Sequence, residues 1–160
     1  MNVAFIPARG GSKGVKLKNL QSVNGESILS RAIKAASEAD KIDLVFVSSD
    51  SNQILTEAKL HGAIDIKRNE DLAKDETSTD PVIIDGLKFI EKNYGKVTNF
   101  ILLQCTSAFT TAKEIDEVVN TLETNLDNHD AAFAVCESHS FLWNYDQKAK
   151  KSLGVNHDIN

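Results

Sequence analysis

The chain has 160 residues, of which 41% are hydrophobic, and it carries a formal net charge of −5 with a pI near 5.3. This length suits a single domain with one core, and no apolar run approaches the length that spans a membrane. The acidic balance argues against nucleic acid or an anionic membrane as a partner for the surface at large. The apolar start, residues 1–6, is too short for a signal peptide, so we expect a cytoplasmic protein with reduced cysteines.

Short apolar runs without polar alternation predict strands that are buried on both faces, as in parallel sheets. Such runs occupy residues 3–6, 44–47, 100–103 and 131–135, with a weaker candidate at 63–66. Apolar residues at helical spacing lie between them, in stretches that begin at Ile28, Ile54, Ile83 and Ile115, the last extending to Leu126. Strand alternating with helix predicts an α/β protein: a three-layer α/β/α sandwich with a mostly parallel, Rossmann-like sheet.

Two of the predicted helices have recognisable start signals. Thr111 and Glu114 have the spacing of a capping box, in which each side chain satisfies a free backbone N–H of the other residue. Asp80 followed by Pro81 predicts a helix that begins there, with the aspartate as N-cap and proline in the first helical position.

Small and polar residues follow the predicted strands. The endings are Pro7-Ala-Arg-Gly-Gly11, Ser48-Ser-Asp50, Gln104-Cys-Thr-Ser107 and Cys136-Glu-Ser-His139. One such ending is more often a capped turn than a ligand site. Ligands of open parallel sheets bind outside the carboxyl ends of the strands, however, so four endings at one edge predict a binding site there.

The loop after the first strand is rich in glycine and in cations, and no acidic residue precedes Glu26. Its glycines allow a close approach of the backbone, and consecutive N–H groups in such a loop bind anions. A solvated basic turn is the alternative, but the position directly after a buried strand favours a phosphate site. The glycine spacing fits neither the P-loop nor the dinucleotide-binding fingerprint.

The stretch "IPARGGSKGVKLKNL" (residues 6–20) resembles the signature loop of the acylneuraminate cytidylyltransferases, the CMP-sialic acid and CMP-nonulosonic acid synthetases. Similar stretches follow in the family's order: "VFVSSD" (45–50), "KRNEDLAKDETSTD" (67–80), "LLQCTSAFTTAKEID" (102–116) and, more weakly, "FLWNYD" (141–146). The resemblance covers nearly all of residues 3 to 146. The related Kdo-activating enzymes carry a different loop. The resemblance implies transfer of CMP from CTP to the anomeric hydroxyl of a sialic acid-like sugar, with release of pyrophosphate.

The resemblance also implies roles for individual residues. Lys18 and Arg9 would be catalytic, Lys18 being the best candidate to stabilise charge in the transition state. The residues expected to bind the nucleotide are Ala8, Arg9, Gly10, Gly11, Ser12, Lys13, Lys18, Asn19, Arg68, Thr77, Ser78 and Thr79. The residues expected to bind the sugar are Gln104, Thr106 and Ser107. Mg²⁺ is the expected cofactor, with Asp50, Asp75 and Asp80 as the nearest acids but no ligand assigned, and a homodimer is expected.

The chain departs from the family pattern in sequence and in length. Cys105 and Ala108 stand where the family has prolines, and Phe109-Thr110 stands where it has Leu-Arg. Cys105 is not expected to be a nucleophile, since no histidine has a motif relation to it. The family continues into a segment that closes over the sugar, forms the dimer and supplies metal ligands. We therefore interpret residues 1–160 as one domain truncated at its C-terminus, and residues 147–160 as a polar tail or the start of that segment.

Two alternative functions stay open on the sequence. One is a catalytically incomplete module that binds CTP. The other is a nucleotidyltransferase for another sugar, such as a sugar 1-phosphate, because those enzymes also have a glycine-rich basic loop after the first strand.

Overall fold

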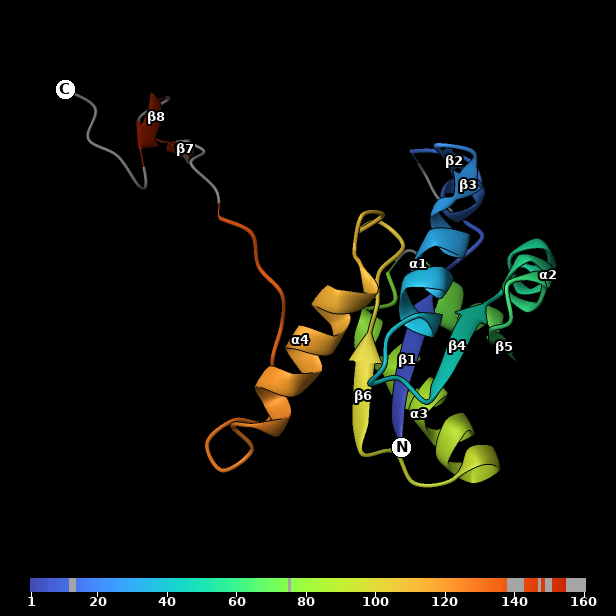
Figure 1. Ribbon diagram of the computed structural model, residues 1–160. Helices are drawn as coiled ribbons and strands as arrows, with labels where there is room; N and C mark the ends of the chain where they lie inside the picture. Colours follow the sequence, from blue (N-terminus) through green and yellow to red (C-terminus); the bar gives the residue numbers. More distant parts are fainter. Residues whose placement is uncertain (12–13, 75, 138–142, 147, 149–150, 155–160) are drawn as a thin grey trace.

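The computed structural model describes residues 1–11, 14–74, 76–137, 143–146, 148 and 151–154 (Figure 1). Its centre is a four-stranded parallel sheet with the strand order β5-β4-β1-β6. The strands are β1 (Asn2–Pro7), β4 (Leu44–Ser49), β5 (Ile64–Lys67) and β6 (Asn99–Leu102). Each corresponds to one of the apolar runs in the sequence, so these strand predictions are confirmed.

Helices cover both faces of this sheet, and α1 lies in front of it and α3 behind it in Figure 1. The bounds are α1 (Ile28–Ser37), α2 (Asn52–Leu60), α3 (Thr79–Tyr94) and α4 (Ala112–Glu123). Successive strand side chains point to opposite faces, so Ala4 and Ile6 pack in the core beneath α1, α2 and α4. Phe5 and its neighbours pack in the core beneath α3. The predicted three-layer α/β/α sandwich is therefore confirmed.

The structure confirms one predicted helix start and corrects another. At α4, Thr111 N donates to Glu114 Oε2 at 2.7 Å and Glu114 N donates to Thr111 Oγ1 at 3.3 Å, which is the predicted capping box. The helix α3 begins two residues before the predicted position, with Ser78 as its N-cap. Asp80 then lies in the first turn, where a carboxylate is favourable near the positive helix end. Pro81 also fits there, because the first N–H groups of a helix have no intrahelical partner.

The prediction of a strand at residues 131–135 is wrong. This segment follows α4 outside the sheet, and Phe133 and Val135 are each 81% exposed. Three of its five residues are alanines. Alanine is depleted in strands and buries little apolar surface, so the run lacks the packing that would fix it as a strand. Within the described part of the chain, no strand pairs with the outer side of β6. Leu126, the last apolar position of the predicted helix, lies beyond α4 and is exposed.

Several short elements have no clear signal in the sequence. They are the 3-10 turns η1 (Lys18–Leu20) and η2 (Glu70–Ala73), and the strands β2 (Ser22–Val23), β3 (Glu26–Ser27), β7 (Trp143–Asp146) and β8 (Lys151–Gly154). The strands form two antiparallel pairs, β2 with β3 and β7 with β8. The sequence after Gln147 shows no periodicity, so β8 was not expected. Among the residues that the structure describes, no helix is long and apolar enough to cross a membrane.

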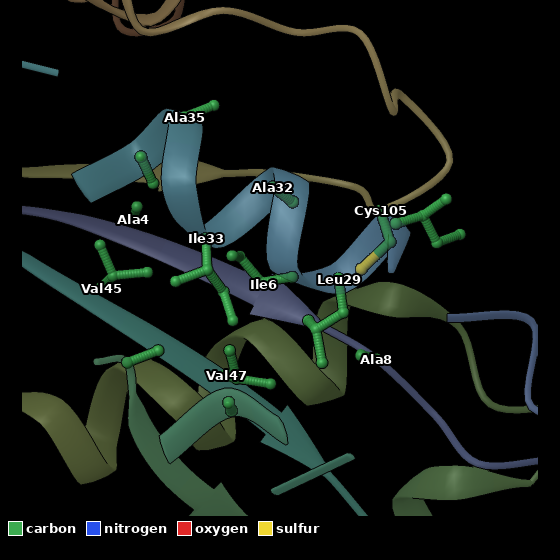
Figure 2. Packing of buried hydrophobic residues seen from close by; sticks show 14 of the residues in the cluster. Ala4, Ile6, Ala8, Leu29, Ala32, Ile33, Ala35, Val45, Val47 and Cys105 are labelled. Carbon is green, nitrogen blue, oxygen red and sulfur yellow. The ribbon is translucent and has the colours of Figure 1, made fainter. Parts of the chain in front are cut away.

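Cys105 belongs to the core beneath α1 although it lies in the loop after β6 (Figure 2). Its side chain is 2% exposed and packs in the same cluster as Leu29 and Ala32 of α1. Burial raises the pKa of the Cys105 thiol to about 12, and the nearby charge of Lys18 opposes this only in part. Cys136, in contrast, is exposed.

The first prediction concerns the contact between α3 and the sheet. Gly86 lies directly against the Phe5 ring, and a Cβ at this position would overlap the ring. Phe5 is fully buried and packs on Phe100, so the ring cannot move aside. Gly86→Ala should lower the free energy of unfolding by about 1–3 kcal/mol, measured by urea denaturation, in spite of alanine's better helix propensity. The exposed control Lys88→Ala should change it by less than about 0.5 kcal/mol. A Gly86→Ala protein as stable as wild type would contradict this packing.

The second prediction concerns the two thiols. The thiolate is the reactive form, and a raised pKa keeps Cys105 protonated well above neutral pH. At pH 8, a thiol reagent such as Ellman's reagent should modify one cysteine of the native protein, and mass mapping should identify it as Cys136. The second thiol should react only after denaturation. Fast modification of both thiols in the native wild-type protein, or of the single remaining thiol, Cys105, in native Cys136→Ser, would contradict the burial.

Candidate functional site

A cavity of about 340 Å³ lies beyond the carboxyl ends of β1, β5 and β6. Most of the predicted site residues line it: Arg9, Lys18, Asn19, Arg68, Thr77, Ser78, Thr79, Gln104 and Thr106. These residues come from segments far apart in the sequence, and the sheet topology brings them together as predicted. The cavity is also lined by Pro7, Leu72, Lys74, Val82 and Cys105, which the sequence did not single out as ligand-binding residues.

The other predicted site residues have different positions. Ala8 is fully buried in the core, so its side chain supports the loop from below. Gly10 and Gly11 lie in the loop after β1 but are not part of the cavity lining, and Ser107 lines the neighbouring groove between β6 and α4. Ser12, Lys13 and Asp75 lie outside the described residues. The ending Cys136-Glu137 does not join this edge, because residues 131–135 are not in the sheet, and Ser138 and His139 are also outside the described residues.

Two hydrogen bonds donated by backbone N–H groups of the loop after β1 hold it against the end of β4, one to a backbone carbonyl and one to a side-chain carboxylate. Ala8 N donates to Ser48 O at 2.9 Å, and Gly10 N donates to Asp50 Oδ1 at 2.9 Å. A Cβ added to Gly10 would lie 2.8 Å from the Cβ of Ser51, so this close approach requires glycine. The position of the loop is therefore set by the strand next to it.

Lys18 and Asn19 reach the cavity from η1, which follows this loop. Asn19 is 8% exposed, and its Nδ2 donates to Arg9 O at 3.1 Å. This hydrogen bond ties η1 back to the loop. Lys18 and Arg9 therefore line the same cavity from two segments that are fastened together.

Arg68 forms a fixed part of the cavity wall. Only 5% of the residue is exposed; its Nε donates to Ser48 Oγ at 3.1 Å and its Nη2 donates to Ser48 O at 2.7 Å. Burial lowers the pKa of the guanidinium, and the carboxylates of Asp50 and Asp85 oppose this shift. Because arginine stays protonated in proteins, the wall carries a positive charge in a fixed position.

Lys74 is the cation that the sequence interpretation missed. It lies in the 67–80 stretch, in the segment between η2 and α3, and its Nζ is 2.6 Å from Asp71 Oδ1. This exposed hydrogen-bonded pair raises the pKa of Lys74 and lowers the pKa of Asp71. Thr77 is held in the same segment, since its Oγ1 donates to Asp71 O at 3.1 Å. Only its place beside the threonines could have suggested Lys74 as a site residue.

The cavity combines positive charge with hydroxyl and amide groups. Arg9, Lys18, Arg68 and Lys74 line it, and no aspartate or glutamate does so among the residues that the structure describes. The lining also contains Ser78 and Thr79 at the start of α3, where free backbone N–H groups and the helix dipole favour anions. This arrangement fits a polyanionic ligand such as a nucleoside triphosphate.

Comparisons with known proteins agree with this chemistry. The chain is 30% identical over 145 residues to N-acylneuraminate cytidylyltransferase A of Danio rerio, an alignment covering 91% of this chain and 32% of that protein. It is 34% identical over 137 residues to the N-acylneuraminate cytidylyltransferase of Escherichia coli, covering 86% of this chain and 32% of that protein. It is 37% identical over 90 residues to the CMP-N,N'-diacetyllegionaminic acid synthase of Campylobacter jejuni, covering 56% of this chain and 38% of that protein. The chain thus spans about a third of the length of these relatives.

Solved structures share the fold at low sequence identity. One is a CMP:2-keto-3-deoxy-manno-octonic acid synthetase complexed with CTP, with a TM-score of 0.63 and 19% identity over 79% of this chain and 49% of that one. Another is a 4-diphosphocytidyl-2C-methyl-D-erythritol synthase, with a TM-score of 0.67 and 12% identity over 97% of this chain and 68% of that one. Both show that this chain shares its α/β fold with these solved structures.

A sequence profile described as cytidylyltransferase matches residues 3–158. Since this match covers nearly the whole chain, and the cationic cavity lies where the sequence stretches shared with the family converge, the chain belongs to the cytidylyltransferase family.

Proposed function

We propose that this chain carries the CTP site of an enzyme that transfers CMP from CTP to the anomeric hydroxyl of a sialic acid-like nonulosonic acid, releasing pyrophosphate. The observation that carries this proposal is the cavity at the carboxyl edge of the sheet, with four cations and no acidic residue in its described lining. The names of the relatives, N-acylneuraminate cytidylyltransferases and a legionaminic acid synthase, support the sugar class.

The cations suit the charge that develops in this reaction. Attack on the α-phosphate builds negative charge on its equatorial oxygens and on the leaving pyrophosphate, so catalysis depends mainly on positioning and on positive charge. Lys18 supplies a compact charge from η1, whereas Arg9 supplies a planar fork suited to phosphate oxygens. The hydrogen bonds to Ser48 fix the Arg68 side chain, so its guanidinium would bind the ligand at one defined position.

The nucleotide and the sugar have separate contacts in this proposal. Thr77, Ser78 and Thr79 lie at the start of α3, where hydroxyls and backbone groups can contact base and ribose. Gln104 and Thr106 follow β6 on another side of the cavity, and Thr106 Oγ1 donates to Gln104 Oε1 at 3.4 Å. These two side chains would contact the sugar.

Magnesium is part of the proposal as the ion that neutralises the phosphates. Among the described residues, no three or more His, Cys, Asp and Glu side chains are grouped to hold a metal ion. Mg²⁺ bound with a nucleotide typically needs only one or two carboxylates besides phosphate oxygens and water. No carboxylate is in the described lining of the cavity, so the phosphate oxygens and water would be the main ligands of the ion. Asp50 lies beside the loop after β1, since its Oδ1 accepts the Gly10 N–H, but it does not line the cavity, and no carboxylate is assigned to the ion.

The central prediction concerns Lys18. Lys18→Ala should lower the rate of pyrophosphate release from CTP and N-acetylneuraminate by about a hundredfold or more, because a cation beside the reacting phosphate is lost. The matched control is Lys16→Ala, since Lys16 is exposed in the same basic loop and does not line the cavity. Equal rates in the two variants would rule out the role of Lys18.

A further prediction, on ligand binding, separates CTP binding from catalysis. CTP at about 100 times its Kd should stabilise the fold by about 2.7 kcal/mol, seen as a rise in Tm, and UTP and GTP at the same concentration should give smaller shifts. Chelation of Mg²⁺ with EDTA should reduce the CTP shift. A CTP shift without turnover of any nonulosonic acid would identify a binding module, and a larger shift with UTP or GTP would identify another nucleotidyltransferase. No shift with CTP would contradict the proposal.

A further inference from the structure

The loop between β6 and α4 consists of two consecutive β-turns. Ser107 N donates to Gln104 O at 3.0 Å, and Thr110 N donates to Ser107 O at 3.1 Å. We call residues 104–110 the double turn. Cys105 and Ala108 occupy the second position of the first and second turn, which is where proline pre-sets the backbone most favourably. The family pattern described above has prolines at these two positions, so this chain lacks two local restraints.

Helix α1 supplies contacts to both turns. Cys105 is buried in the core cluster that contains Leu29 of α1. Two residues further along α1, Arg31 Nε donates to Ala108 O at 2.8 Å. The Arg31 guanidinium carbon also lies 5.5 Å from the centre of the Phe109 ring, a cation–π contact. The second turn is therefore held by Arg31, in addition to the packing of Ala108 against the core cluster.

The segments on either side of the double turn are fixed independently of Arg31. Before it, Leu103 N donates to Phe5 O at 2.9 Å. After it, the capping box of Thr111 and Glu114 fixes the start of α4. The first turn is also anchored by buried Cys105, so loss of the Arg31 contact would loosen mainly the second turn, which shares Ser107 with the first. Gln104 and Thr106 of the first turn line the cavity.

We propose that Arg31 is a positioning residue for the sugar side of the site. It holds the second turn, where the family pattern has a proline at position 108, and it positions the first turn through Ser107, which both turns share. This inference rests on the proposed function, because it assigns the double turn to the acceptor sugar. The cations on the CTP side come from the loop after β1, from η1 and from the segment after β5. Arg31 should therefore affect the sugar much more than CTP.

Lys34 provides a matched comparison on the same helix. Its Nζ is 3.9 Å from Glu26 Oε1, and Arg31 Nη1 is 3.4 Å from Glu26 Oε2. Both residues thus share the Glu26 partner in exposed ion pairs, which contribute little to stability. The contact of Arg31 with Ala108 distinguishes it from Lys34, so comparing the two variants isolates this contact.

The experiment uses the full chain with the variants Arg31→Ala, Arg31→Lys, Lys34→Ala and the double variant Arg31→Ala/Ala108→Pro. For each, the KM for N-acetylneuraminate and the kcat are measured at saturating CTP, the Kd for CTP is measured by thermal shift, and Tm is recorded without ligand. Arg31→Ala should raise the sugar KM by about tenfold, as expected for a lost charge-assisted hydrogen bond, while the Kd for CTP changes less than about twofold. Lys34→Ala should match wild type.

The double variant tests the mechanism of positioning. Proline at 108 should restore the sugar KM to within about threefold of wild type, because it restrains the turn that Arg31 no longer holds. Arg31→Lys keeps the charge but not the Nε donor, so it should fall between wild type and Arg31→Ala. If Arg31→Ala does not fold, Arg31→Lys and its combination with Ala108→Pro make the same comparison.

Three outcomes would overturn the role of Arg31. An unchanged sugar KM in Arg31→Ala excludes it, as does a parallel rise of sugar KM and CTP Kd, which would indicate general damage to the fold. Failure of Ala108→Pro to restore the sugar KM also excludes positioning through this turn. If wild-type protein binds no CTP or turns over no nonulosonic acid, the proposed function itself fails, and the inference about Arg31 fails with it.

Discussion

A single backbone carbonyl, that of Ser48, holds two parts of the cavity in place. It accepts the N–H of Ala8 at 2.9 Å and Nη2 of Arg68 at 2.7 Å. A carbonyl oxygen has two lone pairs, and a buried polar group without a partner destabilises a fold, so both contacts are favoured together. Ser48 can serve both only because β1 and β4 pair in parallel with Pro7 opposite Ser48. The register of two buried strands therefore sets the distance between the loop after β1 and the buried Arg68.

This construction explains how a chain with a net charge of −5 keeps a cationic cavity. The hydrogen bonds that fix Arg68 go to the neutral hydroxyl and carbonyl of Ser48, and Asn19 ties η1 to the loop through an amide. These neutral partners hold Arg68 and η1 in position without cancelling charge at the contact, whereas Lys74 is paired with the carboxylate of Asp71. The acidic residues lie outside the cavity lining within the described part of the chain, where they favour solubility. The cavity thus remains attractive to phosphates although the protein as a whole is acidic.

The sequence predicted the features that depend on local pattern. Runs of β-branched and aromatic residues were recognised as buried strands, and the residues after them were recognised as a site, because parallel strands end at one edge. The prediction of a strand at 131–135 was wrong, because the alanines of this run are apolar but have a low preference for strands. Lys74 and Arg31 were missed for a different reason. Arg31 contacts Ala108, which is distant in sequence, and only the fold brings Lys74 to the same cavity as Lys18, so no periodicity reveals either residue.

Helix α1 connects the two sides of the proposed site. At the start of α1, Ile28 N donates to Gln21 O at 3.0 Å. Gln21 directly follows η1, the 3-10 turn that carries Lys18. One turn later, Arg31 contacts Ala108 of the double turn. Prolines would stiffen the double turn on its own, whereas an arginine on α1 ties it to the segment that holds the phosphate-side cation. Because transfer between two bound substrates depends on their relative alignment to within about 1 Å, a small movement of α1 would carry both sides together and preserve that alignment.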